Sequence, residues 1–229
     1  MDISRNVPIT SILFVACVIT ALRAAPPEIE WSRTRGLVEE AFDLSLETEP
    51  DATIFYTTDG AAPSPDTARL YAEPIQIEET TVLRALVLGA DGETTSIETH
   101  SFLFIDQVKD QEATPAGFPM EIISRRNGPD RPHTFDWAMD PDVLEDVANN
   151  GDLVEHLQDI PTLSVVMNLD DLNFLFENQT RRGVEYERAT SLELIYPDKE
   201  IYSEFKGFQI DCGARMQGGG AGIRRERSR

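Results

Sequence analysis

The stretch that decides the fold runs from Ala52 to Phe104, ATIFYTTDGAAPSPDTARLYAEPIQIEETTVLRALVLGADGETTSIETHSFLF. Apolar and polar residues alternate over Thr53–Thr57, and Val82–Leu88 is a β-branched and aliphatic run. Turn residues separate the runs, among them Asp59-Gly60 and Asp91-Gly92, where a tight hairpin needs a positive φ. Short strands at this spacing, with turn signals between them, predict an antiparallel β-sandwich of the immunoglobulin-like or fibronectin III-like type.

The composition is that of a folded but strongly acidic protein. The 229 residues have room for one large or two small domains. There are 41 acidic and 20 basic residues, which give a net charge of −21 at pH 7. Such a surface repels nucleic-acid phosphates and anionic lipid headgroups, so we expect neither as a partner. Cationic partners or divalent metal would be tolerated, although an acidic solubilising surface on an exported protein is the simpler interpretation.

Cysteine and histidine usage argues against several kinds of site. The two cysteines, Cys17 and Cys212, exclude a disulfide scaffold and a cysteine-based zinc site. Cys212 shares a strand face with Phe208 and Ile210, so we predict a core residue rather than a nucleophile. The histidines show no metal-ligand spacing: His100, His133 and His156. We therefore assign no catalytic, cofactor-binding or metal-ligating residue.

Residues 1–24 have the features of a cleavable signal peptide. A short charged start precedes the uncharged, apolar stretch Ile9–Leu22, and Ala24-Ala25 follow before a proline pair. The apolar stretch is shorter than the roughly 20 residues of a membrane span. We expect an extracytoplasmic mature chain (secreted, periplasmic or at the cell surface) that has no membrane contact after cleavage. An uncleaved anchor and a lipoprotein modified at Cys17 remain alternatives.

Residues 25–106 resemble a known module. Three strings carry the resemblance: Thr57–Gly60 with Pro63-Ser64, Leu70-Tyr71 with Pro74-Ile75, and Thr80–Ala85. The region looks like the β-sandwich domain at the C-terminus of chitobiase and β-hexosaminidase, also met in GH29-type (GH29D-like) glycosidases. The resemblance implies an accessory domain without catalytic residues of its own, often beside carbohydrate-active or surface enzymes.

Three aromatic residues of this domain are candidates for stacking on sugar rings. They are Trp31, Tyr56 and Tyr71, because aromatic faces suit the C–H surfaces of a saccharide. The partner would then be a polysaccharide, or a cell-surface protein. In the alternative interpretation, Tyr56 and Tyr71 cap the hydrophobic core.

The second half of the chain predicts an α+β segment. Residues 107–138 lack periodicity and are rich in proline and glycine, which predicts a linker. Asp140 and Pro141 predict the start of a helix that ends at Asn149-Asn150-Gly151. The pattern beyond predicts short helices over 152–158 and 168–175 and strands over 162–167, 191–196 and 202–217. The fold class is therefore mainly β, with an incomplete α+β segment at 139–229.

This segment carries a second resemblance. Its strings are Met139–Val143, Ile160–Met167 with Asp170-Asp171-Leu172, Glu187–Asp198 and Phe208–Gly219. They are similar to the opening portion of the CotH kinase-like family (spore coat protein H and relatives), whose bacterial members often carry the chitobiase-type sandwich just upstream. The family is implied to have an atypical protein-kinase-like fold that uses ATP and Mg²⁺ to phosphorylate protein side chains.

The catalytic base and metal ligands of a kinase-like fold come from its later part, so we expect no ATP or Mg²⁺ site in this chain. The Arg-rich end, Arg224–Arg229, indicates a frameshift or a truncated gene model, with a natural basic tail as the alternative. We expect an exported, non-catalytic sandwich module attached to an incomplete CotH-like kinase domain. The alternatives are an intact gene product that acts as a cell-surface phosphotransferase, and a stand-alone carbohydrate- or surface-binding protein.

Overall fold

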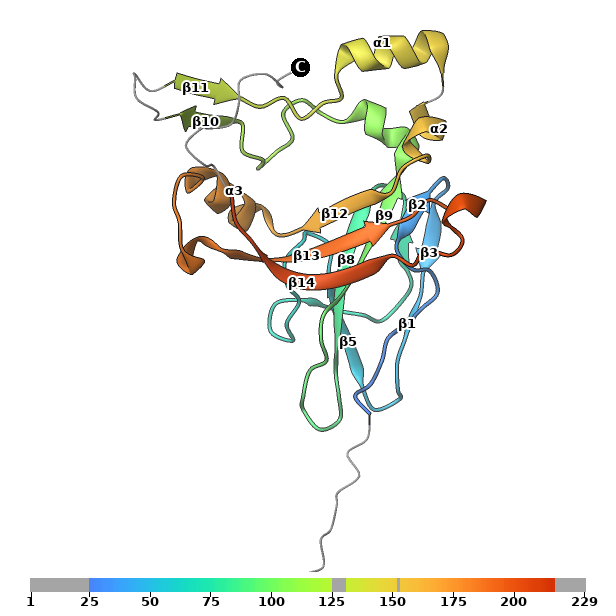
Figure 1. Ribbon diagram of the computed structural model, residues 1–229. Helices are drawn as coiled ribbons and strands as arrows, with labels where there is room; N and C mark the ends of the chain where they lie inside the picture. The colour runs from blue at the N-terminus through green and yellow to red at the C-terminus, as the bar shows by residue number, and fades with distance from the viewer. Residues whose placement is uncertain (1–24, 125–130, 152, 217–229) are drawn as a thin grey trace, which may run out of the picture.

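The computed structural model describes residues 25–124, 131–151 and 153–216 (Figure 1). The chain is mainly β, as predicted, with a β-sandwich followed by a smaller α+β segment. The predicted signal peptide (1–24) and the Arg-rich end lie outside the described residues.

The sandwich has two layers. One is a five-stranded sheet in the order β2-β9-β8-β5-β6, in which only β2 and β9 run parallel. Its strands are β2 Gly36–Val38, β9 Glu98–Phe104, β8 Thr81–Leu88, β5 Thr53–Thr57 and β6 Arg69–Leu70. The facing layer pairs β1 Glu30–Trp31 with β4 Leu46–Glu47, and β3 Phe42–Leu44 with β7 Ile75–Ile77.

The hydrophobic core lies between these layers. Alternate residues of β8 point into it, and Leu83 and Val87 are completely buried. Leu44 and Ile77 meet them from the facing layer. Burying one large aliphatic side chain contributes roughly 1.5–3 kcal/mol, so this cluster is the main source of the sandwich's stability.

Strand β8 is buried on both faces, which accounts for the apolar run Val82–Leu88 that only Arg84 interrupts. Leu83, Ala85 and Val87 face the core. The opposite face carries Arg84 and Leu86, both about 4% exposed, because the α+β segment covers the outer side of the sheet. A strand without a solvent face has no reason to alternate in polarity.

The α+β segment begins where we predicted a linker. After the 3-10 helix η1 Ile105–Asp110, the stretch 107–138 contains the antiparallel pair β10 Glu121–Ser124 and β11 Arg131–Thr134. The sequence pattern did not predict these two strands for two reasons. Each strand is only four residues long, and Pro132 lies in the second. Proline is tolerated on a strand edge that has no neighbouring strand. In a two-stranded ribbon, each strand has such an edge.

The helices follow their capping signals. α1 is Pro141–Asn150, and the Asp140 carboxylate accepts a hydrogen bond from the Asp142 N–H at 2.9 Å. α2 is Leu153–Leu157 and α3 is Leu169–Glu177. Asn168 caps α3 by accepting the Asp171 N–H at 2.7 Å. The side chains at these N-caps satisfy N–H groups that have no partner within the helix.

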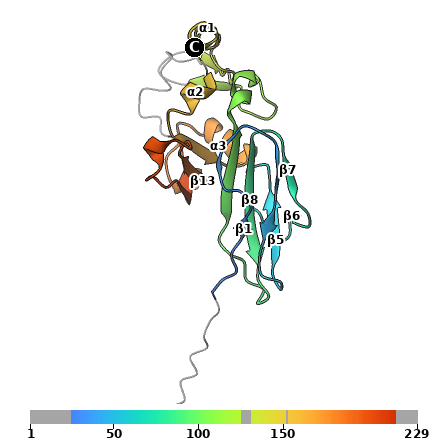
Figure 2. The same ribbon diagram turned by 90° about the vertical axis from the view of Figure 1, so that its right-hand side faces the viewer.

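A three-stranded antiparallel sheet completes the segment. Its order is β12 Thr162–Val166, β13 Arg188–Ile195, β14 Phe208–Ala214, with the 3-10 helices η2 Val184–Tyr186 and η3 Glu200–Tyr202 in its connections. The sheet crosses in front of β8 and β9 in Figure 1 and lies beside the sandwich in the turned view of Figure 2. It therefore packs on the outer face of the five-stranded sheet.

The orientation of this sheet overturns one prediction. Its polar face, with Glu193 and Gln209, lies toward the sandwich. Its apolar face points outward, and four large side chains there are 45–57% exposed: Leu163, Val165, Phe208 and Ile210. Cys212 is exposed on the same face, so its prediction as a core residue is wrong. The pattern separated the two faces correctly, but the polar face is buried because the sandwich presents polar groups to it.

Two glycines with similar backbone angles provide a matched test of this packing. Gly60 and Gly92 have φ values of +79° and +82°. A Cβ on Gly60 would lie 2.3 Å from the carbonyl oxygen of Met167, whereas a Cβ on Gly92 would meet nothing within 4 Å. We predict that Gly92→Ala lowers the free energy of unfolding by about 1–3 kcal/mol, which is the cost of a positive φ. Gly60→Ala lowers it by more, because the added Cβ also meets the Met167 carbonyl. Urea denaturation of the full chain measures both, and equal losses would contradict the close approach.

Candidate functional site

The three aromatic candidates lie at the sandwich core. The Trp31 indole Nε1 donates a hydrogen bond to Glu98 Oε2 at 2.9 Å, and its ring lies 4.1 Å from that of His100. Tyr56 and Tyr71 meet edge-to-face at 6.4 Å. The three side chains are partly buried against the core.

The structure does not assemble these rings into one platform. Among the described residues no ring contact joins Trp31 to either tyrosine. The Tyr71 hydroxyl accepts the Leu46 N–H at 3.0 Å, which ties the ring to the facing layer. This geometry agrees with the core-capping interpretation of the tyrosines, and sugar stacking stays a prediction.

A buried polar network joins the sandwich to the α+β segment. Its centre is Glu193 of β13, which is completely buried. The Ser101 hydroxyl donates to Glu193 Oε2 at 2.5 Å, and the Ser101 N–H donates to Oε1 at 3.4 Å. Arg35 Nε lies 3.3 Å from Oε1. Ser101 and Ser164 hydroxyls lie 2.8 Å apart, so β9 and β12 are joined as well.

A second buried link involves Arg84. Its guanidinium donates to the Gly60 carbonyl at 3.1 Å and to Thr99 Oγ1 at 3.3 Å, and reaches Asp211 Oδ1 of β14 at 3.5 Å. We call Arg35, Arg84, Ser101, Glu193 and Asp211 the interface network. Its charged groups are paired across the contact, which is what burial of charge requires.

Burial and pairing shift the pKa values of these groups in opposite ways. Burial raises the pKa of Glu193 above its ordinary range, although Ser101 and Arg35 favour the carboxylate. Burial also lowers the pKa of Arg84, with Asp211 and Glu193 opposing it, and a guanidinium remains charged at neutral pH.

Nearby, burial lowers the pKa of His100, and the imidazole, whose Nε2 lies 3.9 Å from Glu98 Oε2, lowers the pKa of that carboxyl. The Arg35 backbone N–H donates to His100 Nδ1 at 2.9 Å, so His100 accepts a hydrogen bond through Nδ1. A neutral His100 with its proton on Nε2 fits these contacts.

The raised pKa of Glu193 has a testable consequence. The folded chain binds this proton more tightly than the unfolded chain, so the stability from this group is present at low pH and is lost as the pH rises through the folded-state pKa. We predict that the free energy of unfolding of Glu193→Gln rises relative to that of the wild type as the pH increases from about 4 towards neutrality. Urea denaturation across this range measures the difference, with exposed Glu200→Gln as control. If the free energy of unfolding of Glu193→Gln instead falls relative to the wild type as the pH rises, the pairing of the Glu193 carboxylate with the arginines outweighs the effect of its burial.

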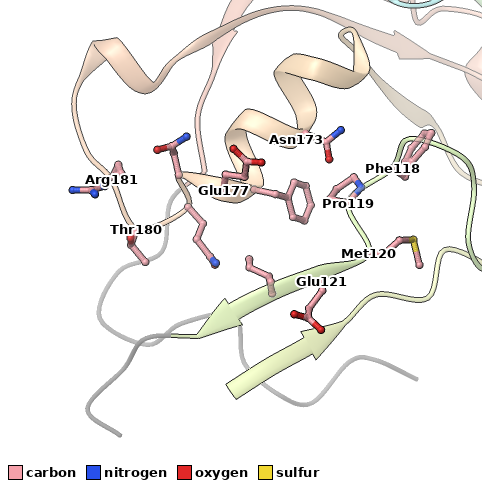
Figure 3. Close-up of a pocket in the computed structure, with 12 residues that line it drawn as sticks. Phe118, Pro119, Met120, Glu121, Asn173, Glu177, Thr180 and Arg181 are labelled. Atoms are coloured by element: carbon pink, nitrogen blue, oxygen red, sulfur yellow. The ribbon is translucent and has the colours of Figure 1, made fainter. Parts of the chain in front are cut away.

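A cleft opens between α3 and β10, on the side of α3 away from the interface network (Figure 3). Its volume is about 730 Å³. Residues 118–122 form one wall, and the last turns of α3 with residues 178–181 form the other. Figure 3 shows Asn173 and Glu177 on α3, Glu121 on the strand opposite, and Thr180 and Arg181 beyond the helix end.

Local contacts hold the two walls together. The Asn173 amide Nδ2 donates to the carbonyls of Gly117 at 2.8 Å and Leu169 at 2.9 Å. Phe176 meets Phe135 edge-to-face at 5.1 Å, and Trp137 donates its Nε1–H to the Pro119 carbonyl at 3.1 Å. The cleft is therefore built on a packed aromatic cluster rather than on loops alone.

The sequence pattern alone does not reveal this cleft. Its walls lie more than fifty residues apart in the chain, and one of them falls in the predicted linker. The available signal was the polar run Asn178–Arg181 directly after an apolar helix. Part of that run is structural, since the Asn178 amide donates to the Phe174 carbonyl at 2.9 Å.

Within the parts of the chain that the structure describes, no three or more His, Cys, Asp or Glu side chains come together in a way that could hold a metal ion. No helix among the described residues has the length and apolar character to cross a membrane.

Comparison with known proteins identifies the first domain. Residues 34–99 match the family model of the chitobiase/beta-hexosaminidase C-terminal domain. The match runs from just before β2 to the first residues of β9, and it includes Tyr56 and Tyr71 but not Trp31. A domain of this type suggests a carbohydrate-associated β-sandwich module. No curated protein matches the chain significantly.

Proposed function

We propose that this chain is an exported accessory module: a carbohydrate-associated sandwich that supports the opening portion of a CotH-like kinase domain. In this proposal the sandwich fixes the position of the α+β segment and performs no chemistry. Export rests on the signal-like pattern of residues 1–24, and carbohydrate association rests on the domain match.

The observation that carries the proposal is the buried interface network. Glu193 and Asp211 come from the α+β segment, while Arg35, Arg84 and Ser101 come from the sandwich. Arg84 is 4% exposed, and Asp211 is its ion-pair partner across the contact. Buried charged and polar groups need partners, so the network favours one mutual orientation of the two parts.

The kinase-like part of the proposal has its own support. The elements follow in the order α1, β12, α3, β13 and β14, and each overlaps or adjoins one of the strings that resemble the CotH kinase-like family. The outward apolar face of β12–β14 also fits this assignment. A contiguous apolar patch marks a contact surface, which the proposal assigns to packing within a larger kinase-like domain.

Polysaccharide retention tests the carbohydrate association. We predict that the full chain is retained on insoluble chitin or β-glucan and elutes with the soluble oligosaccharide, because a sugar site is saturable. Cross-linked dextran serves as the resin control, and the acidic surface is controlled by running the column at high salt. Passage through every polysaccharide resin in the void volume would contradict this part of the proposal.

Nucleotide addition tests the non-catalytic role. We predict that ATP with Mg²⁺ leaves the melting temperature of the full chain unchanged. Ligand at about a hundred times its dissociation constant stabilises a protein by roughly 2.7 kcal/mol, so a real site would raise the melting temperature by several degrees. ADP without Mg²⁺ is the control. A shift that requires both ATP and Mg²⁺ would show that this chain carries a nucleotide site of its own.

A further inference from the structure

We infer that the cleft between α3 and β10 is a binding site for a neutral oligosaccharide. The inference rests on the proposed carbohydrate association for the class of ligand. It places that ligand in the α+β segment, whereas the domain match concerns the sandwich.

The apolar part of the cleft suits the hydrophobic faces of a sugar. Phe118 and Phe176 contribute aromatic rings, and Met120 and Ile122 contribute aliphatic surface. Aromatic rings contact the C–H faces of saccharides well because these faces are apolar. The hydroxyls of the sugar lie around the edge of the sugar ring. The rings are held in place by contacts with Trp137, at 5.1 Å from Phe118 and 6.3 Å from Phe176. A site whose side chains are already positioned loses little entropy on binding.

The polar part of the cleft suits hydroxyl groups. Glu121 and Glu177 are acceptors, Arg181 is a donor, and the Gln179 amide and Thr180 hydroxyl are both. None of these five side chains has a hydrogen bond or an ion pair with another described residue. A sugar hydroxyl both donates and accepts, so a row of vicinal hydroxyls needs such a mixture of partners.

Other classes of ligand fit less well. The cleft lining holds two carboxylates and one guanidinium, and the chain has a net charge of −21, so a phosphate ligand would be repelled. A wholly apolar ligand would desolvate the polar side chains without replacing their hydrogen bonds to water. The volume of about 730 Å³ is within the roughly 300–1,000 Å³ typical of small-molecule sites.

Titration of the full chain with soluble trisaccharides tests the inference. The probes are chitotriose, cellotriose and maltotriose, and calorimetry measures their binding. The variants Glu177→Ala and Glu121→Ala each remove one carboxylate from an exposed position, and Glu145→Ala on α1 is the matched control. We expect at least one probe to bind, with affinity reduced about tenfold or more in both cleft variants and unchanged in the control. Chitotriose against cellotriose shows whether the acetamido group contributes.

The outcomes separate this inference from the proposed function. If the chain is retained on polysaccharide but the cleft variants bind as the wild type does, the inference is wrong and the carbohydrate association stands. If no trisaccharide binds while retention persists, the inference is likewise wrong. If a trisaccharide binds through the cleft but no resin retains the chain, the inference holds and the polysaccharide part of the function fails. Competition by inorganic phosphate would overturn the neutral class of ligand.

Discussion

The structure depends on the pairing of buried charges between its two parts. Glu193 is completely buried between Ser101 and Arg35, and Arg84 connects Gly60 of the sandwich to Asp211 of the outer sheet. Polar groups can be buried only when they find partners, so these contacts restrict how the sheet can lie on the sandwich. The close approach of Gly60 to the Met167 carbonyl adds a steric restriction at the same contact.

This polar contact determines where the apolar surface goes. Because β13 and β14 direct Glu193 and Asp211 toward the sandwich, Phe208 and Ile210 must point outward. The result inverts the usual arrangement, in which the apolar face of a sheet covers the core. It also leaves exposed apolar side chains on the outer face of β12–β14, a feature typical of contact surfaces.

The candidate sites differ in how they are built. In the sandwich, the Trp31 indole N–H donates to Glu98 and the Tyr71 hydroxyl accepts the Leu46 N–H, so the polar atoms of both rings already have partners. In the cleft beside α3, the rings of Phe118 and Phe176 are also packed, and five polar side chains of the lining have no hydrogen bond or ion pair to another described residue: Glu121, Glu177, Gln179, Thr180 and Arg181. Polar side chains without a partner among the described residues can bind a ligand, which is why the cleft carries the inference.

The sequence by itself determined the local structure. Alternation predicted the sandwich strands, Asp140 and Asn168 predicted the helix starts, and Gly92 predicted a turn with a positive φ. Only the tertiary structure decided which face of the β12–β14 sheet is buried, that Cys212 is exposed, and that residues 118–122 meet α3. The physical reason is that a period of two distinguishes the faces of a strand but does not say what each face meets. That depends on the partner surface, which here is polar and comes from a distant part of the chain.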